Sequence, residues 1–349
     1  PGQVVITNSH TPSKTKVQVT KKWDDANNQD GLRPASITVR LYKDGAPTDQ
    51  TLELSEANQW HGTFENLDVN AAGKALNYTV KEENVPEGYT LSIDDKDPAH
   101  PVLTNKHEPT VTQVKVTKKW DDANNQDGLR PKEIRVQLYA GDQKLGKEVV
   151  LSADNKWTHT FEKLAEKANG QDIHYSVKEV DVPEGYTVTE ESKEKGDVVL
   201  TNTHTPSTVD IPVTKIWVDN DNQDGLRPAK ITVKLLANGG EVARKDITSE
   251  TDWKETFTGL PKFKDGKEIV YTLQEEKVEN YSPSIDQENY TITNTHTPGK
   301  TTLSVTKQWD DQEDKDGLRP KSVKVQLYAD GKKSGEVIEL SAENKWTHT

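Results

Sequence analysis

The chain of 349 residues contains no cysteine and no methionine. Without cysteine, no disulfide can reinforce the fold, and thiol catalysis and thiolate metal sites are excluded. The chain starts at Pro1 and shows no signal peptide, so we expect it to be a segment of a longer protein.

Apolar residues are also scarce, at 31% of the chain, and no apolar run is long enough to cross a membrane. Charged residues make up 30%, with a net charge of −13 and no basic stripe that could neutralise phosphate groups. This composition argues against nucleic acid or an anionic membrane as a partner. Eight tryptophans at repeating positions nevertheless indicate a folded chain with thin cores.

The sequence is a tandem array. A Lys-x-Trp strand recurs at near-constant intervals, with its lysines at Lys21, Lys118, Lys215 and Lys307. A strand that ends in Thr-Asn and is followed by proline closes each unit, and the distance from that asparagine to the next lysine is constant. Short connections of constant length favour a rod-like array of repeats over repeats joined by flexible linkers. The predicted parts are the last strand of a preceding repeat (1–13), three complete repeats (14–108, 109–206 and 207–298) and the first half of a further repeat (299–349).

Within a repeat, short alternating stretches are separated by turn residues, and no helical period stands out. In the first repeat the expected strands are 17–23, 37–42, 52–54, 60–64, 78–83 and 102–105. Asp-Gly and Arg-Pro pairs mark the turns between them. The pattern predicts an all-β fold, a tandem array of β-sandwiches.

Three polar side chains share the apolar face of three different strands in each complete repeat. A period of two places Lys21 beside Val17 and Val19, Glu82 beside Val80, and Asn105 beside Leu103. The candidate sites are therefore Lys21, Glu82 and Asn105 in the first repeat, Lys118, Glu179 and Asn202 in the second, and Lys215, Glu275 and Asn294 in the third.

Two interpretations of these residues are open. In the first, lysine and glutamate form a buried structural salt bridge with asparagine hydrogen-bonded nearby. In the second, burial lowers the lysine pKa and raises the glutamate pKa, which leaves a neutral amine beside a protonated acid. That amine could attack the asparagine side chain while the acid polarises the carbonyl and carries protons to the departing ammonia. The product would be a Lys–Asn amide bond, formed once per site.

The order of a Lys-x-Trp first strand, a Tyr-x-Val-x-Glu strand, a Pro-Glu-Gly-Tyr loop and a final Leu/Ile-Thr-Asn strand resembles the B-type (CnaB) repeats of Gram-positive collagen adhesins. The resemblance implies a transthyretin-like or reversed immunoglobulin-like sandwich. It also implies an intramolecular isopeptide bond, with lysine as nucleophile, asparagine as acceptor and Glu82, Glu179 or Glu275 as catalytic acid. It thus favours the reactive interpretation. The third repeat departs from the pattern at 278–281, where we expect a different loop and an unchanged triad.

By the same resemblance, the expected function is a stalk in an extracellular, cell-wall-anchored adhesin that carries an adhesive head in the same chain. The alternative is an adhesive module that itself binds a host extracellular-matrix protein. We expect a monomer that contacts its neighbouring repeats. Apart from the single-turnover bond formation, no enzyme activity, cofactor or metal is predicted, because no nucleotide loop or hydrolase triad occurs.

Two other features of the sequence contain potential metal ligands. The loops rich in Asp and Asn, such as 24–34, lack the spacing of an EF-hand and are interpreted as solvated turns. A histidine follows each terminal asparagine at an offset of two, and without further ligands nearby these histidines are interpreted as strand-end packing residues. They are His10, His107, His204 and His296.

Overall fold

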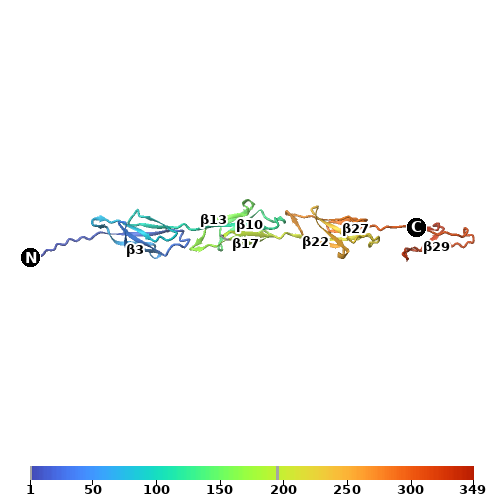
Figure 1. The fold of residues 1–349 in the computed structure, drawn as a ribbon, viewed down its shortest axis with the longest axis horizontal. Coiled ribbons are helices and arrows are strands. Elements are labelled where there is room, and N and C mark those ends of the chain that lie inside the picture. The colour runs from blue at the N-terminus through green and yellow to red at the C-terminus, as the bar shows by residue number, and fades with distance from the viewer. Residues whose placement is uncertain (1, 194–195) are drawn as a thin grey trace. The chain divides into compact units, whose positions relative to one another are not determined.

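The computed structural model describes residues 2–193 and 196–349, and nearly all regular structure in them is β-strand. The chain divides into two compact units, residues 1–207 with 263–267 and residues 208–262 with 268–349. Each sandwich occupies one continuous interval of the colour scale in Figure 1 and is therefore built from consecutive residues. The predicted all-β class is confirmed.

The first two repeats have the same order of elements. The first comprises β1 (Lys14–Asp24), β2 (Ser36–Lys43), β3 (Ala46–Ser55), the 3-10 turn η1 (Glu56–Asn58), β4 (His61–Asp68), β5 (Asn70–Ala71), β6 (Lys74–Ala75), β7 (Tyr78–Glu83), β8 (Thr90–Asp94) and β9 (Val102–Lys106). The second comprises β10 (Val111–Asp121), β11 (Glu133–Ala140), β12 (Gln143–Ser152), η2 (Ala153–Asn155), β13 (Thr158–Ala165), β14 (Lys167–Ala168), β15 (Gln171–Asp172), β16 (Tyr175–Val180), β17 (Thr187–Ser192) and β18 (Val198–Thr203).

The third repeat follows the same plan, and the fourth copy contains shorter strands. The third comprises β19 (Thr208–Val218), β20 (Lys230–Ala237), β21 (Gly240–Thr248), η4 (Ser249–Thr251), β22 (Lys254–Pro261), β23 (Phe263–Lys264), β24 (Lys267–Glu268), β25 (Tyr271–Glu275), β26 (Ser282–Asp286) and β27 (Thr291–Thr295). The fourth comprises β28 (Val305–Thr306), β29 (Ser322–Val325), β30 (Tyr328–Ala329), β31 (Lys332–Lys333), β32 (Ile338–Ser341) and β33 (Thr347–His348).

Two sheets form each complete sandwich. In the first repeat their strand orders are β4-β1-β9-β8 and β3-β2-β7. The first strand, β1, is antiparallel to β4 on one side and parallel to the last strand, β9, on the other, with Lys21 opposite Leu103 and Trp23 opposite Asn105. The strands that begin and end a repeat are therefore direct neighbours. β10 with β18 and β19 with β27 repeat this pairing.

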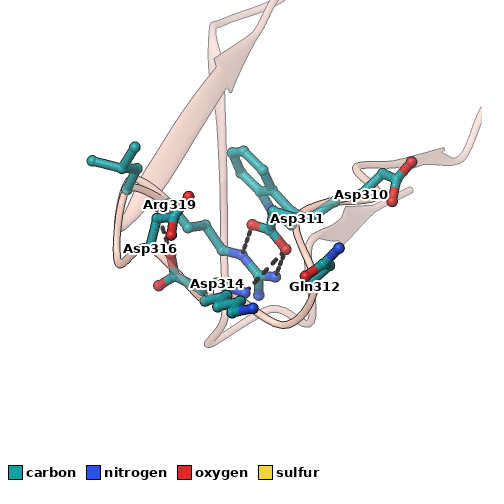
Figure 2. Close-up of a pocket in the computed structure, with 9 residues that line it drawn as sticks. Asp310, Asp311, Gln312, Asp314, Asp316 and Arg319 are labelled. Carbon is teal, nitrogen blue, oxygen red and sulfur yellow. Dashed lines mark hydrogen bonds and ion pairs between the residues drawn. The ribbon is translucent and has the colours of Figure 1, made fainter.

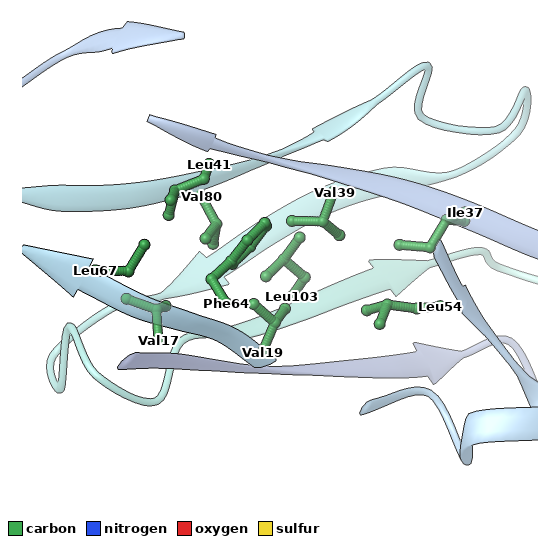
Figure 3. Close-up of a cluster of buried hydrophobic side chains, with 10 residues drawn as sticks. All are labelled: Val17, Val19, Ile37, Val39, Leu41, Leu54, Phe64, Leu67, Val80 and Leu103. Atoms are coloured by element: carbon green, nitrogen blue, oxygen red, sulfur yellow. The ribbon is translucent and has the colours of Figure 1, made fainter. Parts of the chain in front are cut away.

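The core of the first repeat lies between these sheets. Along β1, Val17, Val19 and Lys21 are buried while Gln18 and Lys22 are exposed, so burial follows the predicted period of two. Figure 3 shows ten buried apolar side chains contributed by β1, β2, β3, β4, β7 and β9. Because both sheets contribute to one cluster, the first and last strands are held against the strand that carries Glu82.

The two ends of the chain differ from the complete repeats. Residues 2–13, expected as the last strand of a preceding repeat, form no strand here, and Val4, Val5 and Ile6 are exposed. In the fourth copy Leu340 is buried, whereas Leu303 and Tyr328 are more than half exposed. This copy packs fewer apolar side chains than the complete repeats, as expected from its partial set of strands.

Candidate functional site

Each complete repeat buries one lysine of its first strand. Lys21 lies on β1, Lys118 on β10 and Lys215 on β19, and all three side chains have an exposed fraction of 0%. The apolar alternation of these strands forces the lysine inward, since its neighbours two residues away belong to the core. An amine in this position is stable only if it is paired or neutral.

The acid partner comes from the opposite sheet. Lys21 Nζ lies 2.8 Å from Glu82 Oε2, Lys118 Nζ lies 3.7 Å from Glu179 Oε2, and Lys215 Nζ lies 3.2 Å from Glu275 Oε1. The glutamate side chains are 0%, 0% and 3% exposed. Each pair therefore joins the two sheets through the middle of the sandwich.

The predicted asparagine meets the same acid. The Nδ2 atoms of Asn105, Asn202 and Asn294 donate to Oε1 of the glutamate of their repeat over 2.8, 2.9 and 3.1 Å. Among the described residues, the Oδ1 atom of each asparagine is buried without a hydrogen-bond partner. The structure thus brings amine, acid and carboxamide together in all three complete repeats, with the acid hydrogen-bonded to the asparagine side-chain nitrogen.

Burial shifts the charges of this site. Desolvation lowers the pKa of Lys21, and it lowers the pKa values of Lys118 and Lys215 to about 8. The pKa of Glu179 is raised, again chiefly by desolvation. A lysine with a pKa near 8 is partly neutral at physiological pH.

Aromatic rings cover the amine. The lysine Nζ atoms lie 4.7, 4.3 and 4.4 Å from the ring centres of Trp23, Trp120 and Trp217. The Trp23 ring meets Trp60 and Tyr89 edge-on, with centroid distances of 5.2 and 5.1 Å. The Lys-x-Trp spacing therefore places a ring over the site, and that ring is held by further aromatic contacts.

The sequence predicts that the loops rich in Asp and Asn are solvated turns. The structure shows that this prediction is incomplete, because these loops also contain buried hydrogen-bonded groups. Asp25 is 2% exposed, accepts two hydrogen bonds from the Arg33 guanidinium, and accepts a third from Tyr89 Oη at 2.8 Å. Asp122 and Asp219 repeat this network, and Figure 2 shows Arg319 paired with Asp311 in the fourth copy. The signal that could have revealed it is an arginine eight residues after the aspartate in every copy.

The histidines that follow the asparagines do more than pack. His107 Nε2 lies 2.9 Å from Asp30 Oδ2, and His107 Nδ1 lies 2.9 Å from the Gly88 carbonyl oxygen. The same carboxylate oxygen accepts from the Thr110 backbone N–H over 2.8 Å and so holds the start of the next repeat's first strand. The second and third repeats contain the same arrangement around His204 with Asp127 and His296 with Asp224. His10 lies in the exposed N-terminal segment.

These contacts predict a pH dependence. Both ring nitrogens of His107 face acceptors, so only the imidazolium can donate to both, and the hydrogen bond to Asp30 raises the pKa of His107. The negative charge of Asp25 also raises the pKa of His107. The Tyr89 ring packs against the imidazole, and Glu108 is the next residue in the chain. The stabilisation of the fold by the contact between His107 and Asp30 should be complete below a pH of about 6.5, the pKa of a histidine in an unfolded chain. It should be lost as the pH rises through the higher pKa of His107 in the folded chain.

The measurement is hydrogen exchange at the Thr110 amide, normalised to the exchange rate of an unfolded chain at each pH. We expect protection in acid that declines across the folded His107 titration, and no such step in His107→Gln. The third repeat is an internal comparison, because Asp224 is 27% exposed against 4% for Asp30, so the step at Gly299 should be smaller. A His107 titration at or below the ordinary histidine value would contradict the assignment.

In the part of the chain that the structure describes, no group of three or more His, Asp or Glu side chains is placed to hold a metal ion. No described helix is long and apolar enough to cross a membrane. In the third repeat, where the loop at 278–281 differs, Tyr281 Oη still donates to Asp219 over 2.8 Å, and Glu275 still contacts both Lys215 and Asn294.

Comparison with known proteins connects these features to a family. The model of the Cna protein B-type domain matches residues 17–106, 114–203, 211–295 and 303–349. A collagen adhesin of Staphylococcus aureus is 44% identical over 348 residues, which is 100% of this chain and 29% of that protein. The crystal structure of two B repeat units (B1B2) of the S. aureus collagen-binding protein matches with a TM-score of 0.52 and 44% identity, over 96% of this chain and 88% of that one.

Proposed function

The chain belongs to the family of Cna protein B-type domains, and from that premise we propose that it is part of the stalk of a Gram-positive cell-surface adhesin, with each complete repeat locked by a Lys–Asn isopeptide bond. The observation that carries this proposal is the buried amine, acid and carboxamide in contact in three successive repeats. The longer protein would supply an adhesive head and a cell-wall anchor, since this chain spans 29% of its curated relative.

The bond would form from the contacts already present. A proton moves from the Lys21 ammonium to the Glu82 carboxylate, which leaves a neutral amine. The lysine Nζ then attacks Cγ of Asn105, and the bond from Cγ to Nδ2 breaks. One proton of the attacking amine passes through Glu82 to Nδ2, which leaves as ammonia. Glu82 keeps the proton that it first took from the lysine ammonium until that proton is released to the departing ammonia or to solvent.

Folding supplies the rate enhancement in this scheme. The side chains converge from β1, β7 and β9, which the core holds in place, so attack does not depend on random encounter. The Glu82 contact to Nδ2 suits proton delivery to the leaving group. Bond formation consumes the lysine and the asparagine, so each site would react once, and the chain would therefore not be an enzyme in the ordinary sense.

A stalk gains mechanical strength from such a bond. The bond would link the first strand of a repeat to its last, and these strands are parallel neighbours. Tension entering through one strand could then leave through the other along covalent bonds, without separating the sheets.

Single-molecule pulling tests this proposal. We expect the unaltered chain to release no length from its three complete repeats, because each loop is closed covalently. Lys118→Ala should add one extension step of roughly 280 Å, from about 84 residues at about 3.4 Å each. Steps of that size in the unaltered chain would mean that tension passes through the sheets and would end the stalk proposal in this form.

A second function is favoured by one observation, the name of the curated relative, a collagen adhesin. Under this alternative the repeats would themselves bind a matrix protein. Titration of the chain over immobilised collagen distinguishes the two: saturable binding supports the adhesive role, and its absence leaves the stalk.

A further inference from the structure

Each complete repeat buries a second acid that takes no part in the proposed proton transfer. In the second repeat this acid is Asp122, which directly follows β10 and is 2% exposed. Its Oδ1 atom accepts from Arg130 Nη2 over 2.6 Å, and its Oδ2 atom accepts from Arg130 Nε over 3.0 Å. Oδ2 also accepts from Tyr186 Oη over 2.8 Å. One carboxylate therefore ties the loop after β10 to the segment that precedes β17.

The two residues that Asp122 binds both contact the ring of Trp120. Arg130 Cζ lies 5.4 Å from the ring centre, and the Tyr186 ring meets the indole edge-on at a centroid distance of 5.2 Å. Trp157 makes a further edge-on contact at 5.3 Å. Among the described residues, the Nε1 atom of Trp120 is buried without a hydrogen-bond partner. The position of the ring therefore depends on the groups packed around it, because it has no such bond of its own.

The Trp120 ring in turn contacts the amine that would react. Lys118 Nζ lies 4.3 Å from the ring centre, and the lysine side chain is 0% exposed. The charged groups that act on this amine are Glu179 from the opposite sheet and Asp122 and Arg130 from the loop after β10. Desolvation has the largest effect, and it lowers the pKa of Lys118 although both acids raise it. The exclusion of water therefore controls how much of the amine is neutral.

From these contacts we propose that Asp122 is a positioning residue for the formation of the Lys–Asn bond in the second repeat. By binding Arg130 and Tyr186, it holds the indole over the lysine amine and keeps water away from that amine. This role rests on the proposed function, because it concerns the rate at which the bond forms. The aspartates at the equivalent positions of the other complete repeats, Asp25 and Asp219, have the same partners and act in the same way.

The direction of a pKa change distinguishes this role from that of a simple charge. In the full chain carrying Asn202→Ala the lysine stays free, and the NMR shift of its ε-carbon followed against pH reports its pKa. If Asp122 acted only as a negative charge, Asp122→Ala would lower the pKa of Lys118, because that charge raises it. If Asp122 holds the indole, its loss admits water to the amine and the pKa rises toward the ordinary lysine value. We expect the rise, and a fall or no change overturns the proposal.

The rate of bond formation is the second readout, in the full chain with Asn202 retained. Chain made by cell-free synthesis is denatured at successive times and digested, and mass spectrometry counts the ammonia lost from each repeat. Below its pKa, an amine loses about nine-tenths of its neutral fraction for each unit by which the pKa rises. We therefore expect Asp122→Ala to slow bond formation in the second repeat by about tenfold, while the first and third repeats of the same molecule keep their rates.

Two further variants complete the test. Asp121→Ala removes the exposed acid next to Asp122 and should leave both readouts unchanged. Tyr186→Phe removes one hydroxyl group and no charge, so it decides the question if Asp122→Ala fails to fold. It should raise the pKa of Lys118 and slow bond formation, to a smaller extent than Asp122→Ala. Slow exchange of the Val136 amide, in the core of the repeat, reports that each variant is folded.

The outcomes separate this role from the proposed function. Absence of ammonia loss in every repeat of the unaltered chain would overturn the proposed function and this role with it. Bonds that form in all three repeats, at an unchanged rate and with an unchanged lysine pKa in a folded variant, would overturn this role alone.

Discussion

The intact mass of the denatured chain is expected to fall short of the sum of its residues by three molecules of ammonia, one for each complete repeat. Each Lys–Asn bond expels one ammonia, and denaturation does not reverse an amide bond. Glu179→Ala should reduce the number of losses from three to two, because the second repeat would lack the group that moves protons between Lys118 and Asn202. High-resolution mass spectrometry counts the losses directly.

The fourth copy supplies the matched control for this count. Lys307 Nζ lies 4.6 Å from the Trp309 ring centre, so it contacts a tryptophan as Lys21, Lys118 and Lys215 do. Lys307 is exposed, however, and among the described residues it is not part of a group of lysine, glutamate and asparagine. Lys307→Ala should therefore leave the number of ammonia losses unchanged. A mass equal to the unmodified sum would restore the buried salt bridge as the correct interpretation.

Lys118→Ala is expected to make the second repeat far easier to cleave with protease. A covalent link from Lys118 to Asn202 closes a loop of about 84 residues, and the chain-entropy model for disulfides, applied by analogy, gives about 4 to 5 kcal/mol for a loop of that size. This is a large part of the stability of one small domain. The population open to cleavage should rise by about a thousandfold, with new cuts inside residues 111–203.

Lys119→Ala is the control, because Lys119 is the exposed neighbour on the same strand and its loss removes a lysine without touching the core. Its cleavage rate should match that of the unaltered chain. Equal resistance of Lys118→Ala and Lys119→Ala would show that a cross-link, even if formed, contributes little to the stability of the repeat.

Some of the site could be predicted because alternation along a strand is a local property of the backbone. Val17, Val19 and Lys21 point the same way whatever β1 pairs with, so the sequence indicates that a lysine enters the core. The same reasoning placed Glu82 and Asn105 inward, and all three are buried. The same pattern occurs in all three complete repeats. A single inward lysine could be accidental, but an inward lysine at the same position of three repeats indicates a constrained site.

Other contacts could not be predicted, because they join segments remote in the chain. Asp30 and His107 are 77 residues apart, and their contact depends on where the loop after β1 comes to lie beside the end of β9. Composition alone made that loop look solvated, although the structure buries Asp25 within it. The two hydrogen bonds between the Gln287 side chain and the Leu273 backbone in β25 are of the same kind, since a glutamine in a connection carries no local sign of its partner.

The order of the repeats, the all-β class and the inward direction of Lys21, Glu82 and Asn105 all follow from the amino-acid sequence, because backbone geometry and hydrophobic burial act over a few neighbouring residues. Tertiary structure alone decided that the acid contacts both the lysine amine and the asparagine side-chain nitrogen. The reason is that contacts between strands depend on pairing and register, which the packing of the whole sandwich sets at once.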